Sequence, residues 1–314
     1  MYKVILKRLF MQILKKSVKK ENINRNSYFF FTCQDCFVIM FFMKKAFLYT
    51  LAALFVIIVI PLVSLFAAFF YVESKFNNIK PISRVHETET YKGTSYHNVV
   101  FLHQVNTLKR AKIKENTFKG FEFDIMVLDD GKIIVAHDDI KKKFGYWTNL
   151  EDIFSALESP DDNLFWMDLK SDLSEDNINE ILALADKFNI PRANFFFEIG
   201  GGAGEETAKK LKKQSLLLIY QVPHEMDKDG GDPAKREAVN NEMQRIIDEY
   251  EPFALAGSIG KYHYLKTYFP NMKKAIHYST TKRPSAKKLF MERKMLKDPK
   301  VELYMIDEYT YLPF

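Results

Sequence analysis

Short apolar runs alternate with longer stretches of mixed polarity through most of the chain after residue 98. The runs are rich in Val, Ile, Leu, Phe and Tyr, which favour β-strands, and each run is short enough to form a single strand. The pattern predicts eight strands, at residues 99–105, 120–127, 164–170, 194–199, 216–222, 252–259, 273–279 and 301–309. An extra strand at 132–137 follows Asp129-Asp130-Gly131, and an Asp-Gly pair before such a run is typical of a β-hairpin turn.

The stretches between these runs carry apolar residues at helical spacing. Amphipathic helices are predicted at 149–158, 175–188, 204–213, 236–249 and 284–296. Strands that alternate with helices predict an α/β fold, and eight of them fit a (β/α)8 TIM barrel. An open doubly wound sheet is the alternative, but no G-x-G-x-x-G motif follows the first strand. A barrel would place catalytic residues at the C-terminal ends of its strands.

Residues 46–72 carry no charged side chain. An apolar stretch of this length can cross the hydrocarbon core of a bilayer, which takes about 20 residues in a helix. Signal peptides usually have an apolar region of about 7–15 residues. An uncleaved transmembrane anchor is therefore favoured over a cleaved signal, whose cleavage site would fall near Ala67-Ala68. Pro61 is expected to kink the helix.

Basic residues are concentrated before this segment. The chain has a formal net charge of +6, but ten Lys and Arg residues lie within residues 1–45, and the part after residue 72 is close to neutral. The positive-inside rule therefore predicts that residues 1–45 are cytoplasmic and that the C-terminal domain is extracytoplasmic. A near-neutral domain lacks the basic surface that nucleic acid binding requires, so this partner class is excluded.

The remaining boundaries follow from composition. Residues 73–97 are polar and irregular, which predicts a stalk between the anchor and a barrel at 98–314. Met43, followed by two lysines, is an alternative start of the chain. Cys33 and Cys36 are too few for a disulfide framework, and this C-x-x-C pair lies outside the strand–helix context of redox motifs.

Charged side chains lie on single faces of two neighbouring predicted strands. Side chains alternate along a strand, so Glu122 and Asp124 share one face, while Trp166, Asp168 and Lys170 share a face of the next strand. Clustered buried carboxylates are costly unless a cation neutralises them, and hard divalent cations prefer carboxylate oxygens. We therefore predict an Mg²⁺ or Ca²⁺ site formed by Glu122, Asp124 and Asp168. Lys170 would add a positive charge near an anion.

Two histidines lie at strand ends close to these acids. His103 ends the run Phe101-Leu102-His103, and His137 ends the hairpin strand. The pKa of free imidazole is about 6.5, so one ring can accept a proton while the other donates one. Two histidines, three acids and a lysine at strand ends are suited to metal-assisted attack on a phosphodiester.

The order of these motifs resembles that of a known superfamily. The similarity is to the glycerophosphodiester phosphodiesterase pattern, H-R-G…N-T…G…E-x-D…D-G…V-x-H-D…E-x-K. The matching segments are H-Q-V-N-T at 103–107, G-F-E-F-D at 120–124, D-D-G-K-I-I-V-A-H-D at 129–138 and M-D-L-K at 167–170. Tyr304-Met305-Ile306-Asp307 is similar to the closing segment of the family. The resemblance implies a phospholipase-C-like phosphodiesterase TIM barrel.

The resemblance also implies roles for the matching residues. By this resemblance, Glu122, Asp124 and Asp168 would ligate the metal. His103 and His137 would act as acid and base, and Lys170 would bind phosphate. The implied reaction is attack on phosphorus by a substrate hydroxyl, with a cyclic phosphate as an intermediate or as the product. The implied substrates are glycerophosphodiesters and phospholipid headgroups.

The chain departs from the glycerophosphodiesterase pattern at two positions. Gln104 replaces the arginine after the first histidine, and Asp168 replaces a glutamate. H-x-V-N and D-L-K are more similar to the sphingomyelinase D branch, and H-x-V-N also resembles menorin-like animal proteins. Two other functions therefore stay open, a catalytically silent barrel that binds a ligand or partner at the envelope, and phosphotransfer to an envelope polymer.

Several candidate residues also have purely structural interpretations. Asn106 either binds substrate, or orients the first loop or caps the following helix. Trp166 either contacts substrate or fills the barrel. The glycine-rich loop at 200–204 either cradles a phosphate or forms a strand–helix turn. Further candidates for lining the pocket lie at or just past the ends of later strands: Glu198, His224, His277 and Asp307.

Overall fold

The structure, a computed structural model, divides into two compact units, Met1–Phe66 and Ala67–Phe314. It describes residues 41, 44–84, 89–91, 95–96, 99–137, 145, 147–223, 226, 233–278 and 286–307. Most of the predicted cytoplasmic segment, including Met43, Cys33 and Cys36, lies outside the described residues, as does His224.

A long apolar helix begins in the first unit. The helix Lys44–Asn77 is long and apolar enough to cross a membrane, judged by length and composition, and it contains the anchor predicted at 46–72. It includes a π-helical turn, η1 (Phe55–Val59), followed by α3 (Ile60–Asn77). Pro61 lies two residues after the π turn. Because proline has no N–H to donate, a widened turn at this point accommodates the ring within a continuous helix.

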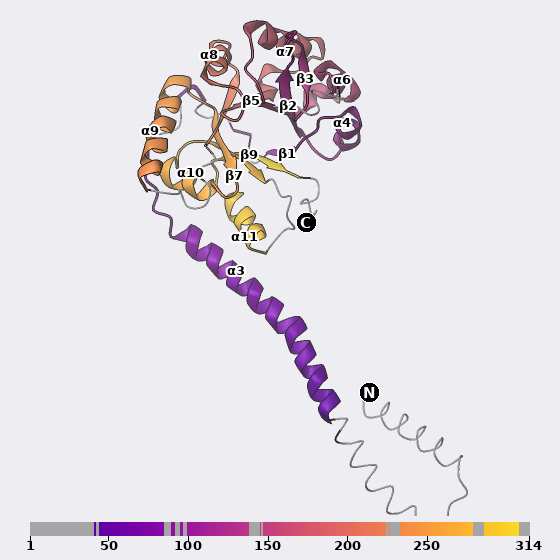
Figure 1. Ribbon diagram of the computed structural model, residues 1–314, viewed down its shortest axis with the longest axis vertical. Coiled ribbons are helices and arrows are strands. Elements are labelled where there is room, and N and C mark those ends of the chain that lie inside the picture. Colours follow the sequence, from indigo (N-terminus) through magenta and orange to yellow (C-terminus); the bar gives the residue numbers. More distant parts are fainter. Residues whose placement is uncertain are drawn as a thin grey trace, which may run out of the picture. The chain divides into compact units, whose positions relative to one another are not determined.

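Eight parallel strands close into a barrel in the second unit (Figure 1). The order around the barrel is β1-β9-β8-β7-β6-β5-β4-β2, and pairing of β1 with β2 closes the ring. This arrangement confirms the TIM barrel and rules out a doubly wound sheet, which stays open. The strands are β1 (Val99–Leu102), β2 (Gly120–Val127), β4 (Leu164–Leu169), β5 (Phe195–Ile199), β6 (Leu217–Gln221), β7 (Ala254–Ser258), β8 (Lys274–Tyr278) and β9 (Val301–Ile306).

The extra strand β3 (Ile133–Val135) forms the predicted hairpin with β2. The two strands are antiparallel, with Ile125 opposite Val135, and Gly131 in the connecting turn has a φ of 86°. This left-handed backbone conformation carries no steric penalty in glycine. β1 pairs only with the first two residues of β2, so β3 occupies the same edge of β2 further along the strand.

Helices cover the outside of the barrel (Figure 1). The five predicted helices are present, and two short helices, α4 and α10, were not predicted, because seven residues give too little periodicity to recognise. Ser174 and Asn177 form a capping box that fixes the start of α7. The helices are α4 (Leu108–Lys114), α6 (Leu150–Ala156), α7 (Glu175–Lys187), α8 (Glu205–Lys213), α9 (Pro233–Tyr250), α10 (Tyr262–Tyr268) and α11 (Ala286–Met295).

Aromatic side chains fill the inside of the barrel. Phe101, Trp166 and Phe196 are fully buried there, and the ring of Phe101 contacts both others edge-on, at centroid distances of 5.6 and 5.8 Å. Such edge-to-face contacts add to the hydrophobic gain from burial. The interior is therefore a packed core rather than a channel, and a ligand can reach the barrel only at its ends.

Parts of the segment predicted as a stalk, 73–97, contact the barrel. Its first residues complete α3, and Val72 and Phe76, four residues apart on one face of this helix, are buried in the core of the second unit. Further along, the backbone N–H of Tyr96 donates to Glu302 Oε2 at 2.7 Å. One narrow apolar face is enough to dock a helix, so the polar composition of this segment gives little sign of these contacts.

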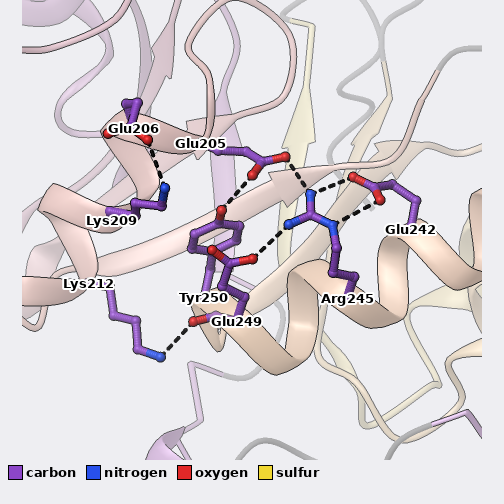
Figure 2. A network of polar contacts seen from close by, with 8 residues as sticks. All are labelled: Glu205, Glu206, Lys209, Lys212, Glu242, Arg245, Glu249 and Tyr250. Carbon is purple, nitrogen blue, oxygen red and sulfur yellow. Dashed lines mark hydrogen bonds and ion pairs between the residues drawn. The ribbon is translucent and has the colours of Figure 1, made fainter.

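A network of charged side chains connects α8 and α9 on the outer surface (Figure 2). Arg245 of α9 forms ion pairs with Glu205 of α8 and, at 2.7 Å, with Glu249. The hydroxyl of Tyr250 donates to the other oxygen of Glu205 at 2.6 Å. Exposed ion pairs each contribute little to the free energy of folding. We therefore assign this network a role in aligning α8 with α9 rather than in stabilising the fold.

A buried ion pair lies at the start of β8. Lys274 has no exposed surface, and its Nζ is 4.0 Å from Asp298 Oδ2. Burial lowers the pKa of Lys274 to about 8. Asp298 Oδ2 also accepts hydrogen bonds from Tyr262 Oη at 2.9 Å and from Lys266 Nζ at 3.0 Å. Asp298 therefore compensates a buried ammonium group.

We expect Asp298→Ala to lower the free energy of unfolding by about 3–5 kcal/mol, the usual cost of removing one partner of a buried ion pair. Urea denaturation of the full chain in detergent measures this. The double variant Asp298→Ala/Lys274→Met should recover part of the loss, because it removes the uncompensated charge. A loss below about 1 kcal/mol, the range of exposed pairs, would contradict a role for this pair.

Candidate active site

Charged residues converge where the parallel strands end, which we call the site end of the barrel. Because all eight strands run in the same direction, their C-terminal ends open on one face. The residues come from adjacent strands or directly follow them: His103 after β1, Glu122 and Asp124 on β2, Asp168 on β4, Lys170 after β4, and Asp307 after β9.

Three carboxylates form the centre of the site. Glu122, Asp124 and Asp168 each offer one oxygen such that the three atoms lie within 4.8 Å of one another. Asp124 and Asp168 are partners in the β2–β4 register, which places them at the same height. Glu122 and Asp124 are fully buried, whereas the Asp168 side chain is 20% exposed. The site is therefore open to solvent on the Asp168 side.

Lys170 is the cation next to these acids. Its Nζ lies 2.5 Å from Asp168 Oδ2 and 3.0 Å from Asp124 Oδ1. Burial lowers the pKa of Lys170, but the two carboxylates outweigh burial and raise the pKa above its usual value. Lys170 is therefore charged at neutral pH, as the sequence-based role in binding an anion requires.

The loop after β1 holds the carboxylates of β2 in place. Gln104 adopts a left-handed backbone with a φ of 55°, and its N–H donates to Glu122 Oε2 at 2.5 Å. The side-chain oxygen of Asn106 accepts from the Asp124 N–H at 3.1 Å, and its amide nitrogen donates to Asp124 Oδ2 at 2.5 Å. The Asn106 side chain thus bonds the backbone N–H of Asp124, as a neighbouring strand would do on this edge of β2. Its predicted contact with substrate stays a prediction.

The three carboxylates outnumber the single ammonium group of Lys170, so the negative charge of the cluster is not fully balanced. Burial, Asp124 and Asp168 raise the pKa of Glu122 well above its usual value. Burial also raises the pKa of Asp168, against the opposing effect of Lys170. Glu122 Oε1 is buried and accepts no hydrogen bond from any residue that the structure describes. Because a buried, unpaired carboxylate oxygen is costly, this donor set fits a hard divalent cation.

His103 points one ring nitrogen into the site. Its Nδ1 lies 2.6 Å from Asp307 Oδ1, and its Nε2 lies 3.9 Å from Glu122 Oε2. An acidic partner at Nδ1 favours the tautomer with the proton on Nδ1, which leaves Nε2 free to accept one. The sequence suggested only that Asp307 lines the pocket. Its pairing with His103 depends on the contact between β1 and β9.

His137 lies two residues after the hairpin strand β3 and is exposed. The preceding residue, Ala136, donates its N–H to the carbonyl oxygen of Asp124 at 2.9 Å, so the chain passes beside the acidic strand just before His137. The structure therefore places His137 next to β2, and its catalytic role stays a prediction.

Trp166 and Glu198 lie inside the barrel, away from solvent. Trp166 has no exposed surface, and its Nε1 donates to Glu198 Oε2 at 2.6 Å. Full burial favours the interpretation in which Trp166 fills the barrel, and its contact with substrate stays an untested prediction. Burial and Asp168 raise the pKa of Glu198 to about 8. Sequence analysis identified Glu198 as a pocket candidate but missed its pairing with Trp166.

The glycine-rich loop at 200–204 supports the end of β4. Ala203 donates its N–H to the Leu169 carbonyl oxygen at 3.0 Å. A Cβ atom on Gly202 would lie 2.5 Å from the Lys170 Cα and 2.6 Å from its carbonyl carbon. The structure favours the interpretation of this loop as a strand–helix turn that packs against the backbone of Lys170.

We expect Gly202→Ala to lower kcat by about tenfold, because the new methyl group would displace Lys170 and small errors in position are costly in catalysis. Gly204→Ala is the matched control, since its Cβ would meet the nearest atom, Asp172 Oδ1, at an ordinary 3.6 Å. Steady-state kinetics of both variants, with circular dichroism to verify folding, tests the prediction. Equal kcat values for the two variants would contradict it.

Comparison with known proteins bears on the fold. No family model and no curated protein matches the chain. A glycerophosphodiester phosphodiesterase from Parabacteroides distasonis is 11% identical over 68% of this chain and 94% of its own, with a TM-score of 0.47. The enzyme of that name from Thermotoga maritima is 15% identical over 67% and 94%, with a TM-score of 0.42. An orotidine 5'-monophosphate decarboxylase from Sulfolobus solfataricus is 14% identical over 68% and 90%, with a TM-score of 0.39. These likenesses concern the fold alone, which the strand order establishes independently.

Proposed function

We propose that this chain is a membrane-anchored, divalent-metal-dependent phosphodiesterase that cleaves a glycerophosphodiester or a phospholipid headgroup. The observation that carries the proposal is the meeting of three carboxylates, with oxygens within 4.8 Å of one another, beside Lys170 and His103 at the site end. The motif order of glycerophosphodiester phosphodiesterases supports the same reaction class. The excess of basic residues before the apolar helix supports an extracytoplasmic barrel.

Glu122, Asp124 and Asp168 would hold the cation, Mg²⁺ or Ca²⁺. When bound, such an ion stabilises negative charge on phosphoryl oxygens and polarises the phosphorus centre. A bound cation would also balance the negative charge of these acids. Lys170 would then not be needed to balance that charge, so its ammonium group could contact a phosphate oxygen. Lys170 is held close enough to Asp168 and Asp124 to keep its position while it does so.

The histidines would move the protons. Nε2 of His103 would take the proton of the attacking hydroxyl, while Asp307 holds the ring through Nδ1. The new bond forms between the attacking oxygen and phosphorus, and the bond from phosphorus to the leaving oxygen breaks. His137 would donate a proton to that oxygen, which leaves as an alcohol. Attack by a hydroxyl of the substrate gives a cyclic phosphate, and attack by water gives a phosphomonoester.

The test is a panel of glycerophosphodiesters and phospholipids with added Mg²⁺ or Ca²⁺, with products read by phosphorus NMR. We expect release of an alcohol that stops when the cation is chelated. The spectrum also separates a cyclic phosphate from a hydrolysed product. If no member of the panel is cleaved with either cation, the catalytic proposal fails and a binding module becomes the better account.

A further inference from the structure

We propose that Gln221, Ser258 and His277 line the part of the site that receives the leaving alcohol. We further propose that this alcohol is a neutral, hydroxylated group such as glycerol rather than a quaternary ammonium alcohol such as choline. Gln221 is the residue to which we assign this selectivity. The inference deepens the proposed function and rests on it. Its evidence is the arrangement of β6, β7 and β8 at the site end.

Three polar side chains face the mouth of the barrel from neighbouring strands. We call them the polar row: Gln221 on β6, Ser258 on β7 and His277 on β8. The residues two positions before them, Ile219, Ala256 and Ala275, are packed inside the barrel. Because side chains alternate along a strand, the polar row also faces inward, one level nearer to the site end. All three residues are partly exposed, so a ligand at the site end can reach them.

An open gap separates Gln221 from Lys170. Register partners on β4, β5 and β6 are Asp168, Glu198 and Ile219. Lys170, Gly200 and Gln221 follow two residues later, so they lie at one level. Neighbouring strands are about 4.8 Å apart, so about 10 Å of this level lies between the backbones of β4 and β6. Glycines 200–202 are exposed and add no side chain to it. A phosphate bound at Lys170 therefore has room for an attached alcohol on the side of Gln221.

The amide group of Gln221 leans into this gap. A Cβ atom on Gly201 would lie 2.8 Å from Gln221 Oε1, so the side chain rests over the loop that follows β5. Among the residues that the structure describes, none forms a hydrogen bond with this amide group. The amide therefore has both a donor and an acceptor for a ligand.

The direction of the reaction places the leaving alcohol on this side. β6 is four strands away from β1 in either direction around the closed ring, so Gln221 lies across the mouth from His103. In a phosphoryl transfer the attacking and leaving oxygens are roughly in line. If His103 activates the attacking hydroxyl, the leaving oxygen lies on the far side of phosphorus. The alcohol attached to that oxygen then extends toward the polar row.

The chemistry of the polar row selects for hydroxyl groups. An amide, a hydroxyl and an imidazole can each donate and accept hydrogen bonds. Quaternary ammonium groups are typically held by aromatic cages, but no inward-facing position on β6, β7 or β8 carries a carboxylate or a Phe, Tyr or Trp ring. Two charged residues lie below the row, Glu198 and Lys261, and they are only 3% and 1% exposed. Lys261 Nζ donates to the Val222 carbonyl oxygen at 2.7 Å, so its charge is directed away from a ligand.

The test compares soluble diesters that differ in one alcohol, with the full chain in detergent and saturating Mg²⁺ or Ca²⁺. We expect kcat/KM to be about tenfold higher for glycerophosphoglycerol than for glycerophosphocholine, because a site that hydrogen-bonds a hydroxyl disfavours a group without one. Glycerophosphopropanol, whose propanol has neither a charge nor a free hydroxyl, should be cleaved as slowly as glycerophosphocholine. This third diester separates hydrogen bonding from charge.

Two variants assign the selectivity to Gln221. Gln221→Leu removes the amide, and Gly201→Ala places a methyl group where Gln221 Oε1 lies. Both should bring the kcat/KM values of the three diesters close together. Gly204→Ala is the matched control, because its Cβ would meet the nearest atom, Asp172 Oδ1, at 3.6 Å, and it should keep the preference. A preference that survives in both Gln221→Leu and Gly201→Ala would overturn the role of Gln221.

Failure of this inference can be distinguished from failure of the proposed function. Equal cleavage of the three diesters, or a preference for glycerophosphocholine, would overturn the assignment of the leaving alcohol and leave the phosphodiesterase standing. Cleavage of another member of the wider panel while these three stay intact would do the same. If no member of the panel is cleaved, the proposed function itself is removed, and the assignment falls with it.

Discussion

His103→Ala is expected to lower kcat by about 10²–10⁴, the usual contribution of a positioned acid or base. Nε2 of His103 faces Glu122, and Asp307 holds the ring at 2.6 Å through Nδ1. No neighbouring group among the described residues duplicates this arrangement. Because the ring is partly exposed, its removal leaves no large cavity and the fold should persist. The measurement is kcat on the best substrate of the panel, with circular dichroism as the check of folding.

Asp307→Asn is the matched variant for this residue. Asparagine keeps an acceptor for Nδ1 but removes the charge that orients and stabilises the protonated ring, so we expect a smaller loss than for His103→Ala. His137→Ala should also abolish most turnover, because its proposed role is the complementary proton transfer. If His103→Ala retained near-normal turnover, His103 would have no place in the mechanism.

Binding of Mg²⁺ or Ca²⁺ is expected to stabilise the protein, and the stabilisation should increase with pH. Without a cation, burial and the neighbouring acids raise the pKa of Glu122 in the folded state, so the folded chain binds a proton more tightly than the unfolded chain. The metal-free protein therefore loses stability as pH rises from the usual range of a glutamate through the raised pKa. A cation compensates the ionised form and removes this loss.

The experiment compares melting temperatures with chelator and with saturating cation across a pH series. At a cation concentration of 100 times Kd, mass action gives about 2.7 kcal/mol of stabilisation. Glu122→Gln should raise the stability of the metal-free protein at neutral pH and abolish both the cation response and turnover. Glu302→Gln, which changes a buried glutamate that bonds Ser95 and Tyr96 elsewhere, should keep the cation response. A cation response unchanged in Glu122→Gln would contradict the metal site.

The fold and the acidic centre were predictable because both depend on short periodicities. Alternation of side chains along β2 assigns Glu122 and Asp124 to one face, and the same rule assigns Asp168 and Lys170 to a face of the next strand. A closed parallel barrel then brings these faces together at the site end. No other information was needed to predict that three carboxylates would meet.

The partners of the site residues were not predictable, because they depend on distant contacts. Asp307 reaches His103 only after β9 pairs with β1, across most of the barrel sequence. The complete burial of Trp166 likewise depends on how far the packed interior of the barrel extends along β4 toward the site end. Docking of the last turns of α3 was missed because Val72 looks like the end of the apolar stretch, and Phe76 lies in a polar segment where it gives a weak signal.

The attachment of β3 to β2 has a consequence for how this barrel can change over evolutionary time. β3 pairs with the part of β2 that extends beyond β1, and its Val135 also bridges to Thr148, so no hydrogen bond that closes the ring passes through β3. Insertions or deletions in the hairpin tip would leave the barrel closed while altering the wall next to His137. If the proposed function holds, a change of substrate selectivity could therefore arise at this turn at little cost to folding.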